Sequence, residues 1–116
     1  MSDKISKLSQ AIRLGATFRP HGRAKLWTVF GDGVIKSCAL GAAYEAVFGL
    51  PQSHHENDGI DGNHYTKLQG RFPELKAKFN GFGSDFVCLQ DNITKANDNH
   101  GMSREQIADE LERIGL

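Results

Sequence analysis

Apolar positions in the first third of the chain change from helical to extended spacing. Ile5, Leu8 and Ile12 fall about one helical turn apart, which predicts an amphipathic helix over residues 3–17 that stops before Pro20. Residues 26–36 then place two apolar runs on either side of Gly-Asp-Gly. This pattern predicts either a short β-hairpin or an extended loop with a tight turn.

The next segment, from residue 37 to Phe48, is predicted to be the central buried helix. Ser37 is a suitable N-cap, and Gly49 ends the helix with Pro51 shortly after it. Alanines along one flank would let a neighbouring element approach closely. The larger apolar residues of the helix share a face: Leu40, Ala43, Tyr44 and Val47.

Loops and short helices alternate through the middle of the chain. A long polar loop is expected over 51–64, and turns are expected over 80–86. Between them, residues 65–79 favour two short helical segments, with Pro73 as the first residue of the second. A further helix is predicted over about 87–97.

The C-terminal segment carries the clearest local signal of a helix. Ser103 and Gln106 have the spacing of a capping box, and Met102 and Ile107 stand where a hydrophobic staple would lie. The buried stripe of this helix is predicted to contain Ile107, Leu111 and Ile114.

These elements predict a mainly α fold, a compact single domain of four to six helices spanning residues 1–116, with room for a small β-hairpin near 26–36. A chain of 116 residues fits one domain and can bury a single core. No apolar run has the length of a membrane span, and the N-terminus lacks the apolar region of a signal peptide. We therefore expect a cytoplasmic protein with no membrane partner.

Charge is balanced overall but divided along the chain. Residues 1–36 carry a net charge of +5 and residues 37–116 a net charge of −5. The basic segment suggests either a surface for nucleic acid or an acidic partner, or a segment that lies against the acidic C-terminal helix of its own chain. Its candidate interaction residues are Lys4, Lys7, Arg13, Arg19, Arg23 and Lys25.

Cys38 stands at the predicted start of the central helix, where a thiolate would be stabilised by the helix dipole. A nucleophilic cysteine also needs a base, and His100 with Asp98 offers a carboxylate–imidazole pair. The sequence Ser-Cys-Ala-Leu-Gly-Ala-Ala resembles the nucleophile helix of papain-like proteases over about seven residues, without the oxyanion glutamine of that family. The alternative is a structural thiol, because free cysteine usually packs as a small apolar residue.

The polar loop contains several residues that can bind metal ions. Its candidate ligands are His54, His55, Asp58, Asp61 and His64, but their spacing matches no closed metal motif. The two cysteines, Cys38 and Cys88, also lack zinc-binding spacing, and we expect two free thiols. We therefore expect no cofactor and interpret the loop as solvated.

Three blocks of the chain resemble small uncharacterised bacterial and prophage-encoded proteins. The shared features are a Cys-x-x-Gly-Ala helix, seen here as CALGAAYEA, and an Asn-Asp turn before a Ser-x-Glu-x-Ile-Ala helix, seen here as ANDNHGMSREQIADELERIG. The opening KISKLSQAIRLGA is also similar. This resemblance implies a phage or mobile-element origin and no particular activity.

The leading functional hypothesis is a small non-enzymatic interaction module that binds a host protein. One rival is a cysteine-dependent hydrolase or transferase that uses Cys38 with His100 and Asp98. The other is nucleic-acid binding through the basic N-terminal segment, which requires those cations to share one exposed face.

Overall fold

The computed structural model describes residues 5–22, 26–29, 33–50, 62–81 and 84–116. The radius of gyration is 12.9 Å, which is the size expected of a compact folded chain of this length. The α-helices are α1 (Leu8–Ala16), α2 (Ala39–Phe48), α3 (Gly62–Arg71), α4 (Leu89–Asp98) and α5 (Arg104–Arg113), with a 3-10 helix η3 (Pro73–Lys76). The strands are β1 (Trp27–Val29), β2 (Ile35–Ser37), β3 (Lys78–Gly81) and β4 (Ser84–Cys88). The predicted mainly α fold with four to six helices is confirmed.

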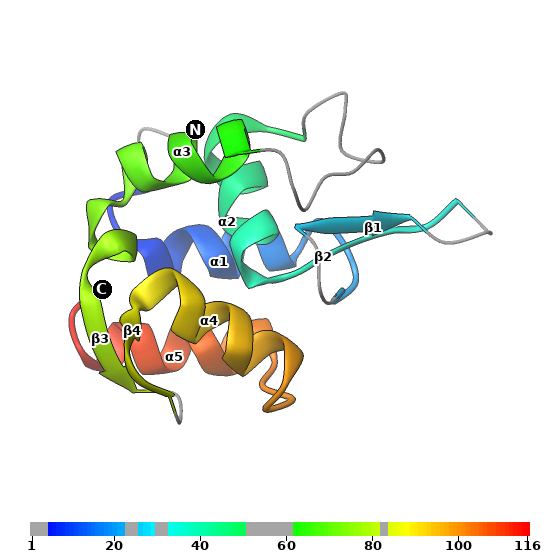
Figure 1. Ribbon diagram of the computed structural model, residues 1–116. Helices are drawn as coiled ribbons and strands as arrows, with labels where there is room; N and C mark the ends of the chain where they lie inside the picture. Colours follow the sequence, from blue (N-terminus) through cyan, green and yellow to red (C-terminus); the bar gives the residue numbers. More distant parts are fainter. Residues whose placement is uncertain (1–4, 23–25, 30–32, 51–61, 82–83) are drawn as a thin grey trace.

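Helix α2 lies at the centre of the fold, with α1 and α4 packed against it (Figure 1). Every residue from Ala39 to Glu45 is buried. The crossing of α1 and α2 is unusually close, because a Cβ atom on Gly15 would lie 1.8 Å from the carbonyl oxygen of Ala42. Only glycine fits at that position, which brings the two helices into backbone contact.

One apolar core joins all five α-helices of the described segments. Leu8 and Ile12 come from α1, Leu40 and Tyr44 from α2, and Leu68 from α3. The remaining large members include Phe72, Leu75, Leu89, Ile93, Ile107 and Leu111, which are almost completely buried. Helix α1 therefore packs on α5 on one side and on α2 on the other.

The predicted hairpin is present as β1 and β2, which pair antiparallel with Thr28 opposite Lys36 and extend away from the helices (Figure 1). A second hairpin, β3–β4, was not predicted and replaces the turns expected over 80–86. It is anchored from a distance, because the Asn92 side chain of α4 donates hydrogen bonds to the carbonyls of Phe79 (2.9 Å) and Cys88 (3.1 Å). The residues of β3 and β4 alone therefore do not predict this hairpin, because the hydrogen bonds that hold it come from Asn92 of α4.

Five boundary predictions were wrong. Helix α3 begins at Gly62, inside the loop expected over 51–64, and β3 begins at Lys78, inside the helical segments expected over 65–79. Helix α1 begins at Leu8 rather than residue 3, because the Gln10 side chain accepts hydrogen bonds from the backbone N–H groups of Ser6 and Lys7 just before it. Ser37 ends β2, and Cys38 is the N-cap of α2. Ile114 lies at the C-cap of α5 and is 37% exposed, so it is not part of the buried stripe with Ile107 and Leu111.

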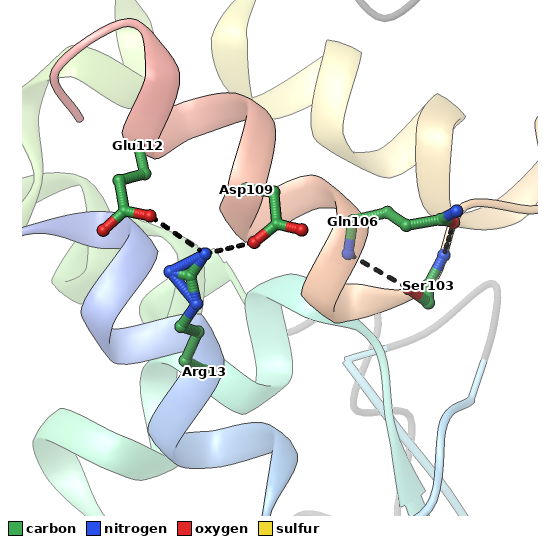
Figure 2. Close-up of polar contacts among 5 residues, drawn as sticks. All are labelled: Arg13, Ser103, Gln106, Asp109 and Glu112. Carbon is green, nitrogen blue, oxygen red and sulfur yellow. Dashed lines mark hydrogen bonds and ion pairs between the residues drawn. The ribbon is translucent and has the colours of Figure 1, made fainter.

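Other local predictions are confirmed. Ser103 and Gln106 form the capping box of α5, with Gln106 N donating to Ser103 Oγ (3.0 Å) and Ser103 N donating to Gln106 Oε1 (2.8 Å). Figure 2 shows this reciprocal pair. Gly49 ends α2 with φ of 85°, and Pro73 begins η3.

Candidate functional site

Cys38 lies where β2 ends and α2 begins. Its backbone N–H donates to the carbonyl of Leu26 (3.1 Å), and its sulfur accepts a hydrogen bond from Gly41 N (3.4 Å). Gly41 makes this approach possible, since a Cβ atom there would lie 2.1 Å from the Leu26 oxygen. The small residues of this helix therefore serve to seat β1 against the first turn of α2.

Asn97, in the last turn of α4, is the polar centre of the same junction. Its Oδ1 accepts from Ala39 N (3.1 Å) and lies 2.6 Å from His21 Nε2. Its Nδ2 donates to Gly22 O (3.1 Å) and to Asp98 Oδ1 (2.8 Å). The amide thus uses both donors and both acceptor positions while it is 1% exposed.

This network also fixes the protonation of one ring nitrogen. Asn97 Oδ1 carries no hydrogen, so His21 Nε2 must be the donor between them. The interpretation of the Asn-Asp sequence as turn chemistry missed this role. The only signal at Asn97 was an Asn-Asp pair near the end of a helix, which does not distinguish a cap from a junction between distant segments.

Arg104 lies at the other side of the β2 terminus and is 6% exposed. Its guanidinium donates to Ser37 Oγ (3.0 Å) and to the carbonyl of Ala16 (3.3 Å) at the end of α1. Burial lowers the pKa of this arginine. Carbonyl groups at a helix C-terminus carry partial negative charge, which favours a cation at this place.

A small pocket opens beside Cys38, between α2, α3 and α4. We call it the Cys38 pocket, and it is lined by Cys38, Ala39, Leu40, Tyr65, Ile93, Thr94, Asn97 and Asp98. The centre of a water molecule can occupy only ≈ 10 Å³ of it. Pockets that hold drug-sized ligands measure roughly 300–1,000 Å³, so this one has no room for a substrate of that size.

Burial in the Cys38 pocket disfavours the ionised forms of two of its side chains, Cys38 and Tyr65. Burial raises the pKa of the Cys38 thiol to about 11, the charge of Asp98 acts in the same direction, and backbone N–H groups of Gly41 and Leu40 lower it only in part. Burial likewise raises the pKa of Tyr65 to about 12, with Cys38 and Asp98 adding to the effect. At neutral pH the thiol is therefore protonated, and desolvation outweighs the helix dipole.

The three residues of the catalytic alternative are only partly brought together. Cys38 and Asp98 share the pocket, but His100 lies in the exposed turn after α4, where its N–H donates to Lys95 O. Within the described segments, the hydrogen bond recorded for Cys38 Sγ comes from Gly41, and no histidine side chain bonds to the sulfur. The histidine whose ring bonds to the Asn97 side chain at the start of α2 is His21.

Two of the basic candidate residues form ion pairs within the chain. Arg13 contacts Asp109 and Glu112 of α5, as Figure 2 shows. Arg19 contacts Glu45 (3.1 Å), while Lys7 is exposed. Lys4, Arg23 and Lys25 lie outside the described residues. The N-terminal helix thus rests on the acidic C-terminal helix of its own chain.

The polar loop with the candidate metal ligands falls mostly outside the described residues, including His54, His55, Asp58 and Asp61. His64 is described, and it is buried with its ring edge-on to Trp27 and Tyr44 at centroid distances of 5.4 and 5.1 Å. In the segments that the structure describes, no three His, Cys, Asp or Glu side chains group as a metal site. His64 is a member of an aromatic cluster there.

Large apolar side chains are exposed where α1 and α2 end. Phe18 is 46% exposed and Phe48 is 45% exposed, with Leu14 at 38% one turn before Phe18. Arg19 follows Phe18 directly, and its partner Glu45 lies one turn before Phe48, so the ion pair joins the two segments. We call Leu14, Phe18 and Phe48 the Phe18–Phe48 surface.

No family model, curated protein or solved structure matches this chain. None of the helices in the described segments has the length and apolar character needed to span a bilayer.

Proposed function

We propose that the protein is a small non-enzymatic interaction module whose partner protein binds the Phe18–Phe48 surface. The observation that carries this proposal is the exposure of two phenylalanines on segments joined by the Arg19–Glu45 ion pair. Aromatic side chains such as phenylalanine are enriched at protein interfaces relative to the rest of the protein surface.

The properties of the Cys38 pocket support a binding role over catalysis. A nucleophilic cysteine reacts as the thiolate, whereas burial holds the pKa of Cys38 at about 11. The space beside the sulfur admits about one water molecule. The partner that we propose is a host protein met in the cytoplasm, in keeping with the resemblance to prophage-encoded sequences.

Photocrosslinking tests the proposal directly. A benzophenone amino acid in place of Phe48 should crosslink the partner in a lysate of the source cells, and the partner is then identified and purified. Binding of that partner should weaken at least tenfold in Phe18→Ser and in Phe48→Ser. Ile114→Ser, which removes an apolar side chain that is 37% exposed at the end of α5, is the matched control and should change the affinity less than twofold.

A second measurement separates this function from its two rivals. Cys38 of the native protein should react slowly with a thiol reagent at neutral pH and rapidly after denaturation. Fast, selective labelling of native Cys38 together with turnover of an ester or amide substrate would establish the hydrolase instead. Binding to DNA or RNA that falls steeply with salt, and persists in Phe48→Ser, would establish the nucleic-acid function.

A further inference from the structure

Arg104, the first residue of α5, bonds to the end of α1 from a distant part of the chain. The last carbonyl groups of a helix have no partner within the helix, so other groups must satisfy them. The local chain satisfies the Gly15 carbonyl, which accepts a hydrogen bond from Phe18 N–H (3.0 Å). The Ala16 carbonyl accepts instead from the Arg104 guanidinium (3.3 Å), 88 residues further along the chain. Arg104 therefore satisfies a carbonyl at the end of a helix to which it does not belong.

The Arg104 guanidinium is fixed in a buried place. The residue is 6% exposed, and it donates through Nη1 to Ser37 Oγ (3.0 Å) and through Nη2 to the Ala16 carbonyl. Its Nε has no partner among the described residues, so these bonds depend on the two Nη groups. A guanidinium presents its donors in a rigid planar fork, so each contact helps to set the geometry of the other. The end of α1 is thereby tied to the end of β2.

Phe18 lies between this contact and a second one. Ala16 is two residues before it, and Arg19 follows it directly. The Arg19 Nε donates to both carboxylate oxygens of the buried Glu45 (3.1 Å each). The chain is thus tied to other elements on both sides of Phe18, while the Phe18 side chain is 46% exposed. A group that is already held in place loses less conformational freedom when a partner binds it.

We propose that Arg104 is a positioning residue for the Phe18–Phe48 surface, because it fixes the end of α1 from which Phe18 projects. This inference rests on the proposed function. Because Arg104 is buried, it acts through Phe18 and not by direct contact with the partner.

Hydrogen exchange of the full chain tests the positioning without a partner. Arg104→Met keeps an apolar stem but removes the donors, and Phe18 N–H should then exchange about tenfold faster, as expected for one lost charge-assisted hydrogen bond. Ser37→Ala is the matched control, because it removes the hydroxyl contact and leaves Arg104 on the Ala16 carbonyl. It should change the rate less than twofold, and Asn99 N–H at the end of α4 serves as the internal reference. An unchanged Phe18 rate in Arg104→Met would overturn the proposal.

Binding of the purified partner, identified by crosslinking at position 48, tests the consequence. Arg104→Met should weaken this binding about tenfold in the wild-type background and less than twofold in Phe18→Ser, because Arg104 acts through Phe18. Equal losses in the two backgrounds would show a merely structural role and overturn the proposal. The proposed function would fail instead if Phe48→Ser bound as tightly as the wild type while Phe18 N–H still exchanged faster in Arg104→Met.

Discussion

Helices α2 and α5 begin in opposite ways. Helix α5 is capped by its own residues, because Ser103 and Gln106 satisfy each other's backbone N–H groups near solvent. Helix α2 begins with a thiol that accepts one hydrogen bond at 3.4 Å, and the N–H of Ala39 is satisfied by Asn97 from a helix 58 residues further along the chain. One start is local, and the other depends on the tertiary fold.

The two helix starts differ in how many other elements depend on them. The start of α2 holds β1, the His21 segment, α4 and the pocket in one buried junction, so a change there spreads to several elements. The capping box of α5 holds only the first turn of that helix, whereas the Arg104 side chain of the same turn donates to Ser37 and Ala16. Phe48 is exposed at the opposite end of α2 from the buried junction, where a partner can bind without disturbing it.

Asn97→Ala should have the largest effect on stability. It leaves Ala39 N–H and the Gly22 carbonyl without partners in a buried place, and each such group costs roughly 1–3 kcal/mol. We expect a loss of about 4 kcal/mol in the free energy of unfolding, measured by urea denaturation. Asn97→Asp should not rescue the loss, because its carboxylate would face the Gly22 carbonyl and the Asp98 carboxylate in a buried place. If Asn97→Ala cost as little as a surface change, the contrast between the two helix starts would fail.

Gly41→Ala should come next. Its Cβ would lie 2.1 Å from the Leu26 oxygen, so β1 and α2 must separate. Overpacking of this kind costs about 1–3 kcal/mol or more. Gly70→Ala is the matched control, because nothing lies within 4 Å of the added carbon and alanine favours a helix by roughly 0.5–1 kcal/mol. The two melting temperatures should therefore move in opposite directions.

These contrasts also explain what the sequence could predict. Helix positions, the capping box at Ser103 and the glycine stop at Gly49 follow from residues close together in the chain. The N-cap of α2 does not follow from neighbouring residues. Ser37 is the better intrinsic cap, but it belongs to β2 and its hydroxyl accepts a hydrogen bond from Arg104, so Cys38 is the N-cap. Tertiary contacts therefore decide which of the two neighbouring residues, Ser37 or Cys38, caps the helix.

The candidate site was less predictable than the fold. Cys38 and Asp98 were named from the sequence and do share a pocket, but Tyr65 and Asn97 were not named. Tyr65 lies 27 residues after Cys38 in the chain, on a different helix, so its place in the pocket depends on how α3 docks. The ring orientation of His21 similarly depends on Asn97, 76 residues away.

An alkaline titration should distinguish the buried helix start from the exposed one. Because the folded protein raises the pKa of Cys38 from 9.0 to about 11, the native state holds its proton where the unfolded chain releases it. The resulting stability is fully present below pH 9 and is lost as pH rises towards 11. We expect a fall of about 2 kcal/mol over that range, since each pKa unit corresponds to roughly 1.4 kcal/mol.

Cys38→Ala should flatten this dependence, although Tyr65 still titrates and should leave a decline towards pH 12. Unfolding free energies of both proteins measured from pH 8 to pH 11 would show the difference. Parallel curves would mean that the thiol is not shielded as the structure indicates.

Ser103→Ala should have the smallest effect, because it disturbs one exposed helix turn. Loss of an N-cap hydroxyl costs about 0.5–2 kcal/mol, and we expect about 1 kcal/mol here. Gln106→Ala should cost less in the Ser103→Ala background than in the wild type, because the two side chains cap reciprocally. A double-mutant cycle by thermal denaturation measures this coupling. Hydrogen exchange should be faster only in the first turn of α5, since the cap is local, whereas the same experiment on Asn97→Ala should show faster exchange in α2, β1 and α4 together.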